Sequence, residues 1–497
     1  MNSRWKWLVG IIAVCSAPFL FIFGMHFKAK HDLAAYKKQL IAQGEKLTIF
    51  ELIPKPVAAE NNGAEELRKS LNGLSAINQD GLPSMKLVLP GKARAIWTQE
   101  ETFDAYEKQR TNIWPTLREN MAKAAHDLER LHQALEKPQL SFRPQYEMGI
   151  RALLPHLAKV KQASQWLAAS ALLHLHENQP LEAAAGLKDV IRLPVIYEDE
   201  PIMFSQLVRI ATVQIAFAAT WEALQYEKWD ETTLKEFQNA WSQLDFKNEI
   251  ETTFAMERAM GIPLFEEYRK TNVWDIPNQT FKDDLDQFSA KIFKDPTEAF
   301  ELLMRRPKQT VWQWWWTYND ERFFIEFLQK DIAVQRAIKR DKSYIHLKKG
   351  SEEPTMIREQ LLLSSFLVQS NRRFFLKCAI AETEREMAVA ACALERYRKR
   401  FSKYPEKLEN LIPEFISQLP RDLLDGEPLR YHRNDDGTFL LYSIGEDGID
   451  DDGDPEFETA STDKQSIQMT KGRDWVWPRR ATEDELKSWE ESLKKRR

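Results

Sequence analysis

Residues 380–401 read IAETEREMAVAACALERYRKRF, and the spacing within this stretch predicts one long helix. The positions that would share one face lie three and four residues apart: Ile380, Thr383, Met387, Ala390, Leu394, Tyr397 and Phe401. Three successive heptads of this pattern are typical of a helix that packs a narrow apolar stripe. Because comparable helical segments fill most of the chain upstream, we expect a mainly α-helical protein.

The residues after this helix predict a small antiparallel sheet. Tyr404-Pro405 ends the helix, and residues 429–433 and 438–443 are two β-type runs. The Asn-Asp-Asp-Gly sequence between the runs is a hairpin signal, and residues 474–478 (DWVWP) are a candidate third strand. We therefore expect an α+β domain at 376–480, followed by a charged C-terminal helix at 481–497.

An acidic loop follows the hairpin. Residues 446–458 contain eight acidic side chains and no basic one: Glu446, Asp447, Asp450, Asp451, Asp452, Asp454, Glu456 and Glu458. Like charges at this density repel, so the loop either binds a counter-ion or stays solvated. Calcium suits such a loop because it takes about six to eight oxygen ligands. A calcium site and a solvated acidic turn both remain open at this point.

The order of motifs in this region resembles the C-terminal domain of the major pseudopilin of type II secretion systems. A helix is followed by Tyr-Pro (404–405), Leu-Pro-Arg-Asp (419–422), Asp-Gly-x-Pro-Leu-Arg-Tyr (425–431) and Leu-Tyr-Ser-Ile-Gly-Glu-Asp-Gly (441–448). The resemblance covers residues 376–458 and implies a helix packed on a small sheet, with a calcium-binding loop after the hairpin. The whole chain also resembles uncharacterised membrane-anchored proteins of the planctomycete and verrucomicrobial type.

The pseudopilin resemblance implies particular calcium ligands. Asp447 matches the first carboxylate of the family's loop, Asp454 matches the later one, and Ile444 would contribute its main-chain carbonyl. Asp450 and Asp452 are further candidate ligands in the same loop. The chain lacks the glycine-ended leader and Phe-Thr-Leu-Ile-Glu sequence of pseudopilins.

The N-terminal region 1–27 is a predicted membrane anchor. Residues 7–25 (WLVGIIAVCSAPFLFIFGM) carry no charge, and nineteen helical residues span about 28 Å, close to a hydrocarbon core. A cleaved signal peptide is the alternative, although Pro18 makes a poor cleavage context after Cys-Ser-Ala. Arg4 and Lys6 favour a cytoplasmic amino end. We thus expect a single-pass protein of the cell inner membrane whose bulk is extracytoplasmic, in the periplasm.

The middle of the chain divides into two parts. Residues 28–98 begin as a polar helix and continue as a Pro-, Gly- and Asn-rich extended segment with a strand candidate at 86–89. Residues 99–375 read as consecutive helices, at 99–135, 147–176, 180–193, 201–226, 231–242, 248–270, 310–340 and 354–375, with prolines 194, 201, 263 and 307 as breaks. Residues 202–224 are apolar but are interrupted by Arg209, so we expect a buried helix there.

Composition and motifs restrict the function. With 70 basic and 75 acidic side chains, the net charge of −5 comprises −8 from the acidic loop and +3 elsewhere, which argues against nucleic-acid binding. Nucleotide, serine-hydrolase and zinc-protease motifs are missing. We expect a non-enzymatic protein with a helical interaction body and a calcium-stabilised domain.

The alternative is an envelope enzyme or lipid-binding protein with a site in the helical body. Trp312, Trp315 and Trp316 share one face at helical spacing. This face would line that site beside Arg305 and Arg306, although core packing also explains the spacing. A catalytic acid cluster at residues 198–200 is a further alternative to a simple helix start.

Overall fold

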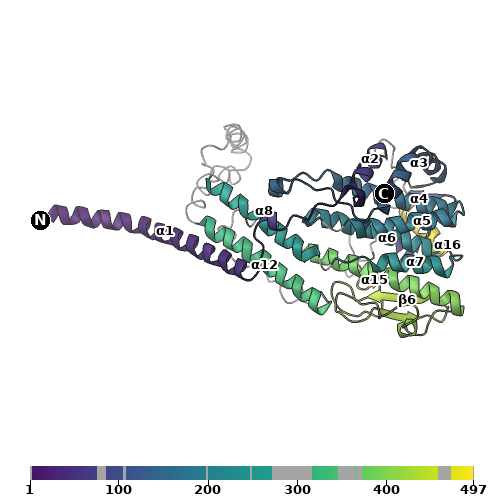
Figure 1. Ribbon diagram of the computed structural model, residues 1–497. Helices are drawn as coiled ribbons and strands as arrows, with labels where there is room; N and C mark the ends of the chain where they lie inside the picture. Colours follow the sequence, from purple (N-terminus) through teal and green to yellow (C-terminus); the bar gives the residue numbers. More distant parts are fainter. Residues whose placement is uncertain are drawn as a thin grey trace.

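The computed structural model describes residues 3–74, 85–104, 108–197, 200–246, 249–270, 316–344, 364, 372–456, 469 and 472–495, with 3–22 and 372 described by their backbone alone. The molecule is elongated: α1 projects from one end, helices pack side by side in the middle, and the sheet containing β6 lies toward the other end (Figure 1). The predicted mainly α-helical class with small sheets is confirmed.

The α-helices are α1 (Ser3–Ala42), α2 (Ala64–Leu74), α3 (Trp114–Glu136), α4 (His156–His176), α5 (Pro180–Ile196), α6 (Met203–Leu224), α7 (Glu231–Ser242), α8 (Glu249–Lys270), α12 (Thr317–Asp341), α15 (Arg372–Phe401) and α16 (Glu483–Lys495). Short 3-10 helices are η1 (Ile49–Glu51), η2 (Ala59–Asn61), η3 (Ile96–Thr98), η4 (Tyr146–Arg151) and η7 (Leu408–Leu411). The strands are β1 (Lys86–Leu89), β2 (Lys92–Arg94), β3 (Thr102–Asp104), β4 (Gln109–Thr111), β5 (Arg430–Arg433), β6 (Phe439–Ser443), β7 (Trp475–Val476) and β8 (Arg479–Arg480).

Helix α1 joins the expected anchor to the expected polar helix without a break. Its forty residues span about 60 Å at about 1.5 Å each. Ala29, Leu33 and Leu40 are buried and face the rest of the body, where α1 packs against α12. The first half of α1 therefore extends beyond the packed helices (Figure 1).

Helix α6 is the central helix of the body. By length and composition it is the one helix of the described side chains that could cross a bilayer, but 67% of its apolar window is buried. It packs against α4, α5 and α15. The expectation of a buried helix here is confirmed.

Two expectations for the amino-terminal half of the body are wrong. The segment expected to be extended contains α2, in which Leu67, Leu71 and Leu74 recur at helical spacing and are buried. The helix expected at 99–135 starts only at Trp114, after the β3–β4 hairpin. Pro115 in its first turn fits a helix start at this point.

Prolines were weaker helix breakers than expected. Pro194 lies in the last turn of α5, and Pro263 lies inside α8. Pro194 has no N–H to donate within the helix. Its carbonyl is one of the last four of α5, which have no partner within the helix, and it accepts a bond from Arg209 Nε (2.7 Å). Pro201 does precede a helix start, and Pro307 and residues 354–363 lie outside the described residues.

The C-terminal elements match the sequence pattern closely. Strands β5 and β6 form an antiparallel hairpin, and β7 pairs with β6 as the expected third strand. Helix α15 is buried well beyond the expected stripe, because it packs against α6 and α7 as well as lying beside β6. Its two cysteines, Cys378 and Cys392, are buried and free. The expected domain boundary at residue 376 falls within α15.

The two ends of the body meet in a second sheet. Strand β8 pairs in parallel with β2, which pairs with β1, and α16 covers the sheet. Phe103 and Trp489 stack edge-to-face (5.7 Å) in a small apolar cluster with Val88 and Leu486. The expected helix at 481–497 and the expected strand at 86–89 are confirmed. The sequence did not predict that α16 packs against β1, or that β8 pairs with β2.

Candidate functional site

The acidic loop follows strand β6, and the buried carboxylate of Asp422 holds the main chain where the strand ends. Asp422 is fully buried and accepts hydrogen bonds from Ser443 Oγ (2.9 Å) and Ile444 N (2.9 Å). Burial raises the pKa of Asp422 above its ordinary value. The main chain at Ile444, an expected calcium ligand, is thus fixed through its N–H to the turn at 419–422.

Arg430 on β5 supplies positive charge to this region. Its guanidinium lies 2.9 Å from Asp422, 2.5 Å from Asp425 and 3.6 Å from Asp450. The Asp450 carboxylate also accepts hydrogen bonds from the Tyr442 hydroxyl (3.0 Å) and from Asp452 N (3.1 Å). One expected ligand, Asp450, therefore already faces a protein cation.

Arg473 supplies a second positive charge. Its Nη1 lies 2.7 Å from Asp454 Oδ2, while Oδ1 of Asp454 accepts a hydrogen bond from Glu456 N (3.0 Å). Asp447 accepts a hydrogen bond from Ile449 N (2.9 Å) within its own turn. In the part of the chain that the structure describes, no three His, Cys, Asp or Glu side chains come together as a metal-binding group.

Asp474, directly before β7, is the residue that holds the loop in place. Its side chain is fully buried, and Oδ2 accepts hydrogen bonds from Gly453 N (2.7 Å) and Asp451 N (3.1 Å). Its Oδ1 is buried without a hydrogen-bond partner. Burial, together with the nearby negative charges of Asp450 and Asp451, raises the pKa of Asp474 to about 6.

Asp474, Arg430 and Arg473 were missed in the sequence analysis. The available signal was their position: Arg430 lies in the strand opposite the loop, and Arg473 directly precedes the candidate third strand. Sequence alone did not show that these residues face the loop, because the pairing of β5 with β6 brings Arg430 there and the pairing of β6 with β7 brings Arg473 and Asp474 there.

A buried polar network surrounds Glu200. Its carboxylate accepts hydrogen bonds from Ser205 Oγ and from the Tyr197 hydroxyl (3.4 Å), and lies 2.9 Å from His156 Nε2. Phe142 stacks on the imidazole at 4.5 Å. Ser205 donates to the carboxylate, so the nucleophile–imidazole contact of a catalytic triad is not formed. This network ties α4 to the start of α6 and supports a structural role.

A second polar cluster lies where α6, α15 and residues 243–246 meet. Arg209 is buried and donates to Asp245 O (2.9 Å), while Glu382 accepts from Phe246 N (2.7 Å). Burial raises the pKa of Cys378 well above its ordinary value. A protonated, buried thiol is a poor nucleophile, so the cluster is a packed core feature.

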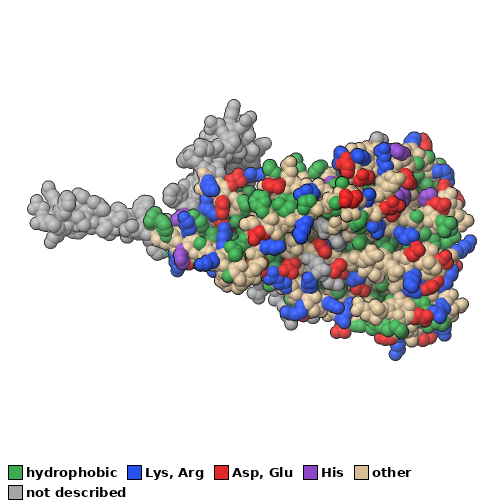
Figure 2. Space-filling model, in the orientation of Figure 1, with side chains coloured by type: hydrophobic (Ala, Val, Ile, Leu, Met, Phe, Trp, Pro, Cys, Tyr) green, Lys and Arg blue, Asp and Glu red, His purple; other side chains and the backbone are tan. Residues whose placement is uncertain are grey.

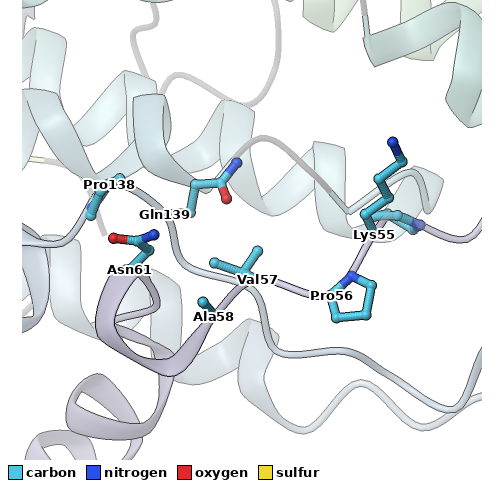
Figure 3. Close-up of a pocket in the computed structure, with 8 residues that line it drawn as sticks. Lys55, Pro56, Val57, Ala58, Asn61, Pro138 and Gln139 are labelled. Carbon is cyan, nitrogen blue, oxygen red and sulfur yellow. The ribbon is translucent and has the colours of Figure 1, made fainter.

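A pocket of about 550 Å³ opens on the surface beside η2. Figure 3 shows Lys55, Pro56, Val57 and Ala58 on one side and Pro138 and Gln139 on the other. Among the described residues that line it, Lys55 is the one charged side chain. The pocket therefore lacks the paired titratable groups that acid–base chemistry requires.

The remaining sequence candidates are only partly covered. Trp316 is partly buried and packs against the core. Residues 305–315, with the other tryptophans and arginines of the alternative site, and residues 198–199 lie outside the described residues. The expected site in this part of the body therefore stays a hypothesis.

Comparisons of the chain with protein-family models, with curated proteins and with solved structures found no significant match.

Proposed function

We propose that the protein is a non-enzymatic, single-pass protein of the cell inner membrane, anchored by residues 7–25. The helical body lies on the periplasmic side as an interaction surface, and the pseudopilin-like C-terminal region is stabilised by calcium. The observation that carries the anchoring proposal is α1 itself. It is one continuous helix. Its first half contains the uncharged stretch, and its second half packs against the helices of the body.

Two groups of buried ion pairs join α1 and the residues that follow it to the body. Glu321 on α12 is fully buried and pairs with Lys37 of α1 (2.5 Å) and with Arg269 of α8 (2.7 Å). Eight residues after Lys37, just beyond the end of α1, Glu45 pairs with the buried Arg258 of α8 (3.0 Å). These contacts give the body a defined direction relative to α1, as an anchored protein that presents a surface requires.

Exposed apolar side chains mark the exit from the expected anchor. Phe23, Met25 and Phe27 are 59%, 38% and 53% exposed, and Lys28 and Lys30 follow directly. Hydrophobic side chains gather where the described side chains of α1 begin (Figure 2). Apolar surface of this kind, followed by lysines, suits the boundary between hydrocarbon and headgroups.

Anchoring is tested by expression of the full chain and carbonate extraction of the membranes. We expect the wild type to remain in the pellet, and the double variant Ile12→Arg and Phe19→Arg to move to the supernatant. Leu181→Arg, an exposed apolar position on α5, is the matched control and should stay in the pellet. Wild-type protein in the supernatant would overturn the anchor.

Orientation is tested by protease accessibility. In spheroplasts, protease added outside should digest the body. If the body stays intact there and is digested only in inverted membrane vesicles, the topology is the reverse of the one proposed.

Calcium binding is supported by the unpartnered Oδ1 of Asp474 beneath the acidic loop. An anionic oxygen buried in this way gains a partner when a cation binds. We expect millimolar calcium to raise the melting temperature of the intact protein over a chelator control, since a ligand specific for the native state stabilises it.

Two variants, Asp447→Ala and Asp454→Ala, should each abolish the calcium shift. Asp435→Ala, an exposed acid in the hairpin turn, should retain it. A wild-type melting temperature that is the same with calcium, with magnesium and with chelator would leave the loop held by Arg430 and Arg473 alone.

A further inference from the structure

An exposed apolar patch lies on the side of the body, where η1 and η4 contact each other and α8. Its members are large apolar side chains with high exposed fractions: Phe50 76%, Met148 54%, Ile150 47% and Leu153 83%. Figure 2 shows hydrophobic side chains gathered over the region labelled α8 in Figure 1. Neighbouring Ile49 and Tyr146 are buried, so the patch rests on a packed base.

The height of this patch above the expected bilayer follows from a chain of ion pairs. Arg151 of η4 pairs with Glu267 of α8 (2.9 Å), and Arg269, two residues later, pairs with Glu321. Glu321 also pairs with Lys37 of α1 (2.5 Å). The patch therefore lies near the level of Lys37, which is twelve residues beyond the end of the uncharged stretch at Met25. At about 1.5 Å per residue this is about 18 Å along α1.

This height excludes the hydrocarbon as the cover of the patch when α1 stands upright. Amphipathic surfaces that lie on a membrane insert only about 5–10 Å into the headgroup and acyl boundary. An isolated apolar patch held well above that boundary, on the flank of the body, instead faces the extramembrane part of a neighbouring protein.

A second copy of this chain fits the patch best. Copies anchored by the same helix share one orientation and one height, so identical patches meet across a two-fold axis along the membrane normal. The patch also carries both signs of charge, since exposed Glu147 and Arg151 alternate with its apolar residues in η4. A two-fold axis can therefore place Arg151 of one copy, which already pairs with Glu267 of its own chain, opposite Glu147 of the other. Confinement to a membrane raises the effective concentration, so a small patch suffices.

We propose that the patch of Phe50, Met148, Ile150 and Leu153 is the self-association surface through which two anchored copies form a dimer. This inference rests on the anchoring proposed above.

The test is disulfide cross-linking in native membranes, in a Cys15→Ser background that leaves only the buried Cys378 and Cys392. Oxidation of Leu153→Cys should give a dimer through the same residue of the two copies. Leu181→Cys is the matched control: this leucine is 80% exposed and follows α4 at the end opposite Leu153. We expect no cross-linked dimer from the control.

A second measurement does not depend on cysteine geometry. Single-molecule photobleaching in supported lipid bilayers should give a dimer dissociation constant about tenfold higher for Leu153→Asp than for the wild type. Leu181→Asp should leave this constant unchanged. A Leu153→Cys chain that stays monomeric, that cross-links no better than Leu181→Cys, or that cross-links to a different protein overturns the proposal.

Carbonate extraction of the same membranes separates this result from the anchoring proposal. Anchored but monomeric protein overturns only the dimer. Extractable protein overturns the anchor, and a Leu153→Cys dimer in that soluble fraction would still support the self-association surface.

Discussion

Glu45 lies three residues beyond the end of α1, with its Oε2 3.0 Å from Nη2 of the fully buried Arg258 on α8. The same carboxylate accepts hydrogen bonds from Arg336 Nη1 (2.7 Å) and Gln329 Nε2 (2.9 Å), both on α12. One acidic side chain thus joins the end of the expected anchor helix to two helices of the body. The pairing explains how a long projecting helix keeps a fixed direction.

Replacement of Glu45 should destabilise this junction strongly. In Glu45→Gln the guanidinium of Arg258 stays buried without a counter-charge, and the loss of one partner from a buried pair costs about 3–5 kcal/mol. Arg336→Gln is the matched control, because Arg336 pairs with the same carboxylate but is 48% exposed. It should cost less than about 1 kcal/mol. Urea unfolding of the detergent-solubilised protein measures both, and equal losses would contradict a special role for the buried pair.

Two glycines near the β5–β6 hairpin should respond differently to alanine. Both have positive φ, +72° at Gly445 and +81° at Gly437, so alanine costs about 1–2 kcal/mol at either. At Gly445 an added Cβ would lie 2.0 Å from the carbonyl oxygen of Arg473, whereas Gly437 has open space. Gly445→Ala should therefore lower the melting temperature more than Gly437→Ala, and similar shifts would mean that the loop and β7 separate easily.

Protonation of His132 should link α3 and α5. Its hydrogen bond to Asp189 raises the pKa of His132 above the ordinary value of 6.5. The folded state then binds the proton more tightly than the unfolded state, so the stabilisation is full below about pH 6.5 and is lost as pH rises through the raised pKa. Between pH 6 and 8.5 the melting temperature of the wild type should fall further than that of His132→Gln. Parallel curves of melting temperature against pH for the two proteins would refute this.

Asp474 should give a pH dependence of the same sign as that of His132, because its pKa is also raised. Its pKa of about 6 exceeds the unfolded value of 3.8. The stabilisation from its protonated form is full below about pH 3.8 and is lost as pH rises through about 6. In chelator, Asp474→Asn should therefore flatten the pH dependence of stability over this range.

The exposed Asp435→Asn serves as the control for Asp474→Asn. It should leave the pH dependence of the melting temperature as in the wild type. If Asp474→Asn also leaves that dependence unchanged, then Asp474 is not buried in solution as it is here.

Local sequence by itself determined the course of most helices and of the hairpin. Residues 231–242 form a helix at the expected bounds, as do residues 249–270 within one residue, and Asn-Asp-Asp-Gly closes β5 against β6. These features depend on residues only a few positions apart, so helix propensity and turn residues in the sequence predict them. The concentration of acid at 446–458 was visible for the same reason.

Tertiary structure decided what those elements contact. The burial of α15 on nearly all sides, the pairing of β8 with β2 and the approach of Arg430 and Arg473 to the acidic loop join residues far apart in the chain. Such contacts depend on how whole helices and strands pack, and no local pattern encodes the partner. The chain therefore specified a dense negative charge, whereas the fold supplied the arginines and the buried Asp474 that set its chemistry.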